Sequence, residues 1–232
     1  MLLDGHPFGD IRRTDQAAPL EDVRLLAPII PSKILCVGRN YLGNATQTGG
    51  DVPAEPLIFA KPATAVIGPD DEIRLPRLSR EVHHEAELAV VVGRLTRNIA
   101  VEDASTAVLG YTCANDVTAR DLQRSDGQWT RAKGFDTFCP LGPWIQTDVD
   151  PVAGLRVRCS VNGEVRQDAT TTDLVFDVAQ LVAYCAAFTT LLPGDVILTG
   201  TPAGVGPLHD RDVVTVTVDG IGDLTNQCTA EA

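Results

Sequence analysis

Residues 82–93 read VHHEAELAVVVG, and this stretch decides much of the fold because it places two carboxylates in an apolar, β-branched run. Such a run predicts a strand. Side chains alternate along a strand, so Glu85 and Glu87 point the same way and their oxygens converge. Two like charges held that close on an apolar sheet repel unless a cation lies between them. The motif therefore favours a hard divalent cation with oxygen ligands, and a solvated strand face is the common alternative.

A second group of polar residues follows the run AVLGYTCA at 107–114, which predicts a buried strand. The segment VTARDLQ at 117–123 then predicts a helix, which puts Asp116, Arg120 and Gln123 on one face at i, i+4 and i+7. That face presents a carboxylate, a guanidinium fork and an amide side by side. An N-capping Asp116 with a salt bridge to Arg120 is the plainer alternative. Three carboxylates that met in space would form a magnesium site beside an anion clamp.

Residues 125–144, SDGQWTRAKGFDTFCPLGPW, are rich in glycine, proline and aromatic residues, which favours a long ordered loop over regular structure. Ordered loops of this length often carry function. Lys133 lies within this loop and can reach a substrate anion. The alternative is a solvated surface lysine.

The composition bounds the class of protein. A chain of 232 residues is long enough for one large core, and nothing in it demands two. The formal net charge of −12 disfavours nucleic acid and anionic membranes as partners, because both require basic clusters. We expect a small-molecule substrate instead.

The cysteines are scattered and form no C-x-x-C pair: Cys36, Cys113, Cys139, Cys159, Cys185 and Cys228. We interpret them as reduced, buried, small hydrophobic residues, which is typical of a cytosolic protein. No segment approaches the roughly 18 consecutive apolar residues of a membrane helix, and residues 1–10 lack the features of a secretory signal. We therefore expect a soluble, cytoplasmic protein.

The remaining pattern is mainly that of strands. Apolar or alternating runs at 57–60, 65–67, 155–161, 196–198 and 213–218 predict strands, and Asn162-Gly163 predicts a type I′ hairpin turn before residues 164–166. One clear helix is predicted over 177–188. Few helices among many strands indicate a single mixed, mainly β domain at 32–232, preceded by a short N-terminal region at 1–31.

Five motifs carry a resemblance to a known family: GRNY at 38–41, HHEAEL at 83–88, NDVTARD at 115–121, KGFDT at 133–137 and LTGTPAGVG at 198–206. Together and in this order they closely resemble the fumarylacetoacetate hydrolase family. The likeness is greatest to its small bacterial members, described as 2-hydroxyhepta-2,4-diene-1,7-dioate isomerases, 5-carboxymethyl-2-hydroxymuconate isomerases and acylpyruvases. It runs from about Ser32 to the C-terminus. The resemblance implies a distorted β-sandwich or barrel that forms a homodimer, with residues 1–31 as a remnant of a small N-terminal β region.

The resemblance also implies the site. Its metal, Mg²⁺ or Mn²⁺, would be held by Glu85, Glu87 and Asp116. Its substrate-anion site would include Arg39, Arg120, Gln123, Lys133 and Thr201.

The segment after the first motif departs from the family pattern. In the hydrolytic members a His and, three residues later, a Glu lie on a lid helix over the substrate and activate the attacking water. Here the segment is LGNATQTGG at 42–50, with Asn44 in place of the His and Gln47 in place of the Glu. An amide does not accept a proton near neutral pH, so a general base worth about 10²–10⁴-fold in rate is absent.

The function expected from these residues is metal-dependent chemistry on enolisable 2-oxo acids, namely isomerisation, tautomerisation or decarboxylation through a metal-bound enolate. Lys133 could carry the proton at C3, because burial and a neighbouring cation both lower a lysine pKa. His83, on the same strand face as Glu85, is the alternative proton carrier, although a supporting hydrogen-bond role is more common for such a histidine. A C–C hydrolase of acylpyruvate type and a non-hydrolytic paralogue that binds metal and ligand are the other two hypotheses.

Overall fold

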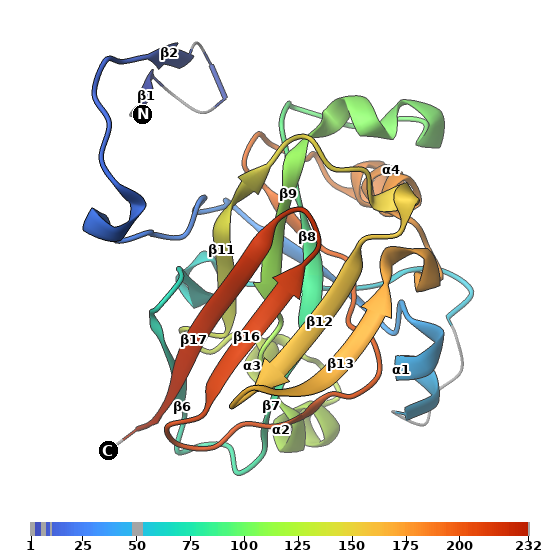
Figure 1. Ribbon diagram of the computed structural model, residues 1–232. Coiled ribbons are helices and arrows are strands. Elements are labelled where there is room, and N and C mark those ends of the chain that lie inside the picture. Colours follow the sequence, from blue (N-terminus) through green and yellow to red (C-terminus); the bar gives the residue numbers. More distant parts are fainter. Residues whose placement is uncertain (1–2, 6–7, 10, 48–52, 232) are drawn as a thin grey trace.

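The two largest sheets of the chain curl around a shared core, with few helices beside them (Figure 1). The computed structural model describes residues 3–5, 8–9, 11–47 and 53–231. Strands dominate these residues, which confirms the expected mainly β fold with few helices.

A seven-stranded sheet forms the centre of the fold, in the order β4-β3-β14-β8-β9-β11-β5. Its strands are β3 (Ile34–Gly38), β4 (Leu57–Lys61), β5 (Val66–Ile67), β8 (Ala86–Val92), β9 (Val108–Asn115), β11 (Cys139–Gln146) and β14 (Val196–Leu198). Every residue of the central strand β8 is buried. Leu88 and Val90 belong to one core cluster, whereas Ala89 and Val91 belong to the other. The apolar run at 88–92 is therefore continuous because both of its faces are covered.

A five-stranded sheet, in the order β13-β12-β16-β17-β6, packs over β8 and β9 (Figure 1). Its strands are β6 (Glu72–Leu75), β12 (Arg156–Val161), β13 (Glu164–Thr170), β16 (Val213–Val218) and β17 (Gly222–Ala230). The predicted hairpin between β12 and β13 is confirmed, because Asn162 and Gly163 have φ values of 52° and 80°. Positive φ at both turn positions is the requirement of a type I′ turn.

Smaller elements make up the rest of the described residues. The other strands are β1 (Leu3–Gly5), β2 (Ile11–Arg13), β7 (Val82–His84), β10 (Thr118–Ala119) and β15 (Gly206–Pro207). The helices are α1 (Leu42–Gln47), α2 (Arg120–Asp126), α3 (Thr130–Lys133) and α4 (Val178–Phe188), and short 3₁₀ segments are η1 (Leu20–Asp22), η2 (Ala63–Ala65), η3 (Val101–Ala107), η4 (Pro151–Ala153) and η5 (Thr171–Asp173). The predicted helix at 177–188 is confirmed, and Asp177 caps it by accepting a bond of 2.8 Å from the Gln180 N–H.

Three local expectations were wrong. The run at 82–93 is two strands rather than one, because the Glu85 N–H donates to the side-chain oxygen of Asn115 at 2.9 Å instead of to a main-chain carbonyl. Residues 117–119 are not helical, because Thr118 pairs with His83 in a β-ladder and the helix begins only at Arg120. The expected loop at 125–144 contains the end of α2, all of α3 and most of β11.

Part of the N-terminal region packs against the core. Phe8 and Ile29 contact the second core cluster, so part of the predicted N-terminal region at 1–31 contacts the large sheet. All six cysteines are free and buried, as expected. Within the described residues, no helix is long and apolar enough to cross a membrane.

Candidate active site

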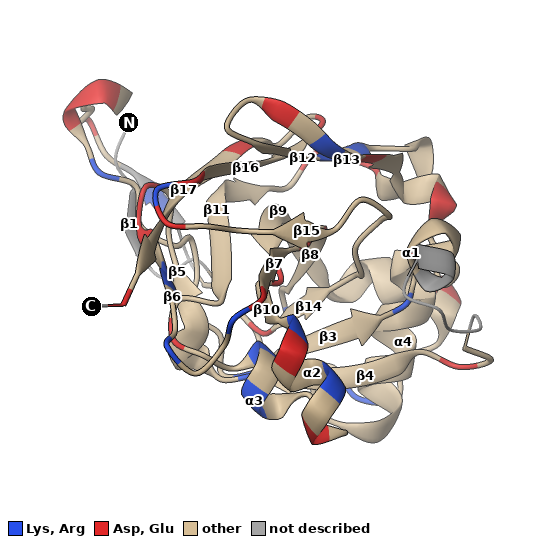
Figure 2. Ribbon diagram, turned by 90° about the horizontal axis from the view of Figure 1, so that it is seen from below, with Lys and Arg blue, Asp and Glu red and all other residues tan. Residues whose placement is uncertain are grey.

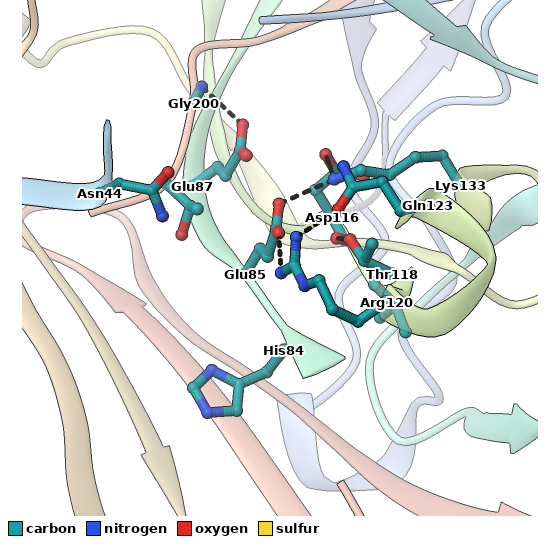
Figure 3. A network of polar contacts seen from close by, with 12 residues as sticks. Asn44, His84, Glu85, Glu87, Asp116, Thr118, Arg120, Gln123, Lys133 and Gly200 are labelled. Carbon is teal, nitrogen blue, oxygen red and sulfur yellow. Dashed lines mark hydrogen bonds and ion pairs between the residues drawn. The ribbon is translucent and has the colours of Figure 1, made fainter. Parts of the chain in front are cut away.

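Three buried carboxylates meet at one point of the large sheet. Glu85 lies between β7 and β8, Glu87 follows on β8, and Asp116 directly follows β9, which pairs with β8. One oxygen from each lies within 4.8 Å of the other two. The convergence of Glu85 and Glu87 expected from strand alternation is therefore present, and the adjacent strand adds the third carboxylate (Figure 3).

Backbone contacts around the break at Glu85 fix its geometry. The Asn115 side chain accepts a bond from the Glu85 N–H, and the Glu85 carbonyl accepts one of 2.8 Å from the Asp116 N–H. The segment that carries Glu85 is thus tied to the end of β9. This explains why a non-pairing residue in the middle of an apolar run has one defined position.

Two lysines contact the carboxylates from opposite parts of the chain. Lys133 Nζ, at the end of α3, lies 2.6 Å from Asp116 Oδ2 and 2.8 Å from Glu85 Oε2. Lys61 Nζ, at the end of β4, lies 2.8 Å from Asp116 Oδ1. Both lysine side chains are almost completely buried.

Arg120 is the third cationic side chain that contacts the carboxylates. Its guanidinium forms an ion pair with Glu85 and donates to Gln123 Oε1 at 2.6 Å. The alternative in which Asp116 pairs with Arg120 along a helix is wrong, because Asp116 precedes the helix and pairs with Lys61 and Lys133 instead. Only Arg120 and Gln123 share a helix face, one turn apart.

Burial and charge act unequally on these groups. Burial raises the pKa of Glu87 well above its usual range, and repulsion from Asp116 and Glu85 adds to this effect. Burial opposes ionisation of Glu85 as well, but Lys133 and Arg120 outweigh it and lower that pKa to about 2. Burial also opposes the charge on Lys133, yet Asp116 and Glu85 attract it more strongly and raise its pKa. The two carboxylates therefore outweigh burial at Lys133, and the lowering expected from a neighbouring metal cation stays a prediction.

Glu87 differs from the other two acids in having no lysine or arginine partner among the described residues. Its Oε2 accepts one bond of 2.7 Å, from the Gly200 N–H (Figure 3). Gly200 has a φ of 101°, and a Cβ there would lie 2.7 Å from the Asn40 Cβ, so only glycine fits this position. Asn40 in turn donates to the Thr199 carbonyl at 2.8 Å and holds the segment in place.

This cluster fits a divalent cation. Its donor set consists of hard carboxylate oxygens, which Mg²⁺ and Mn²⁺ prefer. The Lys133 ammonium already bridges Glu85 and Asp116, which shows that these two side chains are oriented to share one cation. Glu87 has spare acceptor capacity on the same spot, because its carboxylate receives a single main-chain donor.

A cavity of about 460 Å³ opens over the carboxylates. Every predicted site residue whose side chain is described lines it: Arg39, Asn44, His83, Glu85, Glu87, Asp116, Arg120, Gln123, Lys133 and Thr201. Part of its wall is apolar and aromatic, formed by Val37, Phe59, Trp129 and Val205. The cavity can thus hold an anionic head at the charged end and an unsaturated or apolar tail against the wall.

The remaining predicted residues take distinct places around this cavity. Arg39 reaches it from a left-handed backbone position with φ of 58°. His83 Nε2 lies 3.2 Å from Glu81 Oε1, and burial, with Arg120 nearby, lowers the pKa of His83 to about 4. Thr201 Oγ1 donates to the Ala86 carbonyl at 2.8 Å.

The lid segment is partly defined. Asn44 lies in α1, is buried, and its Nδ2 donates to the Pro202 carbonyl at 3.4 Å. Gln47 is the last residue of α1, and its side chain lies outside the described part of the structure. Of the two lid residues predicted to replace the hydrolytic His and Glu, only Asn44 has a described side chain.

Sequence reasoning missed Lys61. Its ammonium is buried and also donates to the carbonyls of Val117 and Phe138, at 3.1 and 2.8 Å. The available signal was a lysine that ends the apolar run at 57–60 immediately before Pro62. A charge in that context needs a buried partner.

The helices α2 and α3 lie side by side and carry several Lys and Arg residues, and α2 carries Asp residues as well (Figure 2). Two of these arginines have acidic partners, since Arg124 pairs with Glu81 and Arg131 with Asp126. Within the described part of the chain, the charges of these two arginines are therefore balanced by acids.

Comparison with protein families gives two matches. Residues 33–229 match the family model described as fumarylacetoacetate (FAA) hydrolase C-terminal, and residues 1–28 match the one described as Rv2993c-like, N-terminal. Protein Rv2993c of Mycobacterium tuberculosis is 55% identical over 223 residues, which are 95% of this chain and 84% of that protein. Oxaloacetate tautomerase fahd2, mitochondrial, of Xenopus laevis is 47% identical over 218 residues, which are 88% of this chain and 68% of that protein.

Solved structures share the fold. A 5-carboxymethyl-2-hydroxymuconate delta-isomerase from Mycobacterium smegmatis superposes with a TM-score of 0.93 at 53% identity, covering 99% of this chain and 89% of that chain. A maleylpyruvate hydrolase from Sphingobium sp. SYK-6, in complex with manganese(II) ion and pyruvate, superposes with a TM-score of 0.81 at 39% identity, covering 92% of this chain and 76% of that chain. Isomerases and hydrolases thus occur on this one scaffold.

Proposed function

We propose that this chain, which belongs to the fumarylacetoacetate hydrolase family, is a divalent-metal-dependent enzyme that enolises 2-oxo acids. It would tautomerise, isomerise or decarboxylate them. The observation that carries this proposal is the group of three buried carboxylates within 4.8 Å of one another, facing a cavity that also contains Arg120 and Lys133. That arrangement provides metal ligands and an anion-binding group for the same small molecule.

The metal site would consist of Glu85, Glu87 and Asp116, and Mg²⁺ or Mn²⁺ is the ion that suits them. When bound there, the ion supplies Lewis-acid polarisation of the 2-oxo carbonyl and stabilises the negative charge that develops on enolisation. The carboxylates orient that ion, and Gly200 orients Glu87 through its N–H.

The substrate would be held by the cationic side of the cavity. Arg120 offers a planar fork to the substrate carboxylate, and Gln123 holds that fork through its Oε1. Thr201 and Arg39 also line the cavity and would add polar contacts to the same molecule.

Proton transfer at C3 would fall to Lys133 or His83, which both line the cavity. Lys133 lies between two of the metal ligands and can hand a proton to a carbon bound beside them. His83 contacts Glu81 on the outer side, where a proton can exchange with solvent. In either case the side chain must be within hydrogen-bond reach of the substrate atom.

The lid segment favours enolisation over hydrolysis. Asn44 and Gln47 occupy the places where the family resemblance leads us to expect a basic His and a Glu, and amides do not activate water. The Xenopus relative named as an oxaloacetate tautomerase supports the same direction. C–C hydrolysis of acylpyruvates is the second candidate, and the hydrolase that was solved with manganese and pyruvate supports it.

One assay separates these reactions. The protein is incubated with Mg²⁺ or Mn²⁺ and a panel of oxaloacetate, acetylpyruvate, fumarylpyruvate and 2-hydroxymuconate-type dienes, and products are followed by NMR and enol absorbance. Enolisation, isomerisation or decarboxylation that stops on chelation supports the proposal. Rapid cleavage of acylpyruvates favours the second candidate, and full activity in excess EDTA contradicts both.

We also propose that the protein acts in the cytoplasm as a homodimer. The six buried, unpaired cysteines suit a reducing compartment. The homodimer follows from the family resemblance alone, and light scattering of the purified chain tests it.

A further inference from the structure

Gln167 is the one buried residue of β13, whose other residues are exposed or partly exposed. It lies on β13, at the edge of the five-stranded sheet (Figure 1), and is 1% exposed. The pairing of β12 with β13 shifts register here, since Cys159 faces Gln167 while Ser160 faces Val165. The extra residue, Arg166, is a β-bulge, and a bulge re-aims the neighbouring side chain.

The Gln167 amide joins two segments of the candidate active site. Its Oε1 accepts from the Ala86 N–H at 3.0 Å and lies 3.0 Å from His84 Nδ1. Its Nε2 donates to Thr201 Oγ1 at 2.7 Å and to the Pro202 carbonyl at 2.9 Å. The Ala86 donor and the Pro202 acceptor fix which end of the amide is oxygen. His84 Nδ1 must therefore carry the proton of this contact.

These partners flank the carboxylate cluster directly. Ala86 is the residue between Glu85 and Glu87, so the bond to its N–H sets the backbone from which both carboxylates project. Thr201 and Pro202 follow Gly200, whose N–H holds Glu87. One side chain thus fixes both the strand that carries Glu87 and the loop that supplies its only described donor.

A second contact holds the same loop against β13. Gly204 has a φ of 97°, and a Cβ there would lie 2.0 Å from the Arg166 carbonyl oxygen. Any side chain at this position would therefore push the loop away from the bulge. The bulge, Gln167 and Gly204 form one clasp, made of a close backbone approach and four side-chain hydrogen bonds.

We propose that Gln167 is a positioning residue for the metal site, which acts on Glu85 and Glu87 through Ala86 and on Glu87 through the loop 200–202. The inference rests on the proposed function, because it assigns the carboxylates to a metal ion. Groups that orient metal ligands from behind commonly alter metal affinity by about ten- to hundredfold when they are removed.

The test compares two buried amides by substitution with apolar residues of similar size. Gln167→Met removes the clasp bonds without adding charge. Asn226→Leu is the matched control: Asn226 is equally buried, and its Nδ2 donates to the carbonyls of Gly68 and Asp71 at 2.9 Å each, away from the cavity. Calorimetry with Mn²⁺ alone gives the dissociation constant, and thermal unfolding reports stability. We expect both variants to lose stability, and only Gln167→Met to bind Mn²⁺ about ten- to hundredfold more weakly.

Three outcomes are decisive. A wild-type chain that binds no Mn²⁺ contradicts the proposed function, and the inference falls with it. A wild-type chain that binds Mn²⁺ while Gln167→Met binds it equally well contradicts the inference alone, as does an equal weakening in Asn226→Leu. Gly204→Ala serves if Gln167→Met does not fold. The added Cβ would push the loop away from the Arg166 carbonyl, so we expect weaker Mn²⁺ binding, and unchanged binding in this variant overturns the inference.

Discussion

Lys61 Nζ lies 2.8 Å from Asp116 Oδ1, which joins the end of β4 to the residue after β9 through two completely buried charges. The same ammonium donates to the carbonyls of Val117, Lys133 and Phe138. It therefore connects the segment that carries a predicted metal ligand with the helix that carries Lys133. This makes Lys61 part of the scaffold beneath the site rather than part of its surface.

Removing this ammonium should unfold the chain more easily. Lys61→Met removes one of the two lysine partners of Asp116 and leaves three carbonyls short of a donor, so we expect the free energy of unfolding to fall by about 3–5 kcal/mol. Urea denaturation measures it. Lys33→Met is the control, because Lys33 pairs with Asp195 but is partly exposed, and its loss should be smaller. Equal losses of unfolding free energy in the two variants would contradict the prediction that the buried Lys61 pair stabilises the fold more than the partly exposed Lys33 pair.

Neutralising the acids should separate metal binding from stability. Glu87→Gln keeps the shape of the side chain and leaves no cation without a partner, so it should abolish Mn²⁺ binding with little loss of stability. Asp116→Asn should also abolish binding but destabilise the fold, because it weakens the pairing of Lys61 and Lys133. Calorimetry with Mn²⁺ and thermal unfolding are measured for both. Unchanged Mn²⁺ affinity in Glu87→Gln would remove that residue from the metal site.

The guanidinium of Arg120 should matter for substrate more than for metal. Arg120→Lys keeps the charge and loses the planar fork, so KM for a 2-oxo acid should rise about ten- to hundredfold, consistent with the loss of a charged hydrogen bond. The Mn²⁺ affinity should change much less. Arg131→Lys is the control, since Arg131 pairs with Asp126 on the surface. An unchanged KM would assign Arg120 to a structural ion pair with Glu85.

Restoring a basic pair on the lid should create hydrolysis. If Asn44 and Gln47 replace the hydrolytic base, the native chain cleaves acylpyruvates poorly, and Asn44→His with Gln47→Glu should raise cleavage within the range of about 10²–10⁴-fold that a general base supplies. Product formation is followed by NMR, with Asn44→His alone as the comparison. The idea fails if the native chain already hydrolyses acylpyruvates at rates typical of enzymes, about 1–10³ s⁻¹.

Local pattern alone determined a large part of this protein. Alternation along the run at 82–93 placed Glu85 and Glu87 on one side, and the structure brings their oxygens together. Asn162-Gly163 defined a hairpin, and helical spacing defined α4. These features follow from sequence because each depends on residues a few positions apart, whose geometry the backbone fixes.

Only the tertiary structure decided which groups complete the site. The Gly200 N–H donates to Glu87, which lies 113 positions away in the sequence. Lys61 contacts Asp116 from the end of β4, a strand that is not a neighbour of β9 in the sheet. The strand order of the large sheet brings these segments together, and no local periodicity encodes that order. The expected pairing of Arg120 with Asp116 was wrong for the same reason. Because Thr118 pairs with His83 in a β-ladder, the helix begins only at Arg120. Arg120 therefore forms its ion pair with Glu85. The carboxylates were thus readable from the chain, whereas their cations and their supports depend on long-range packing.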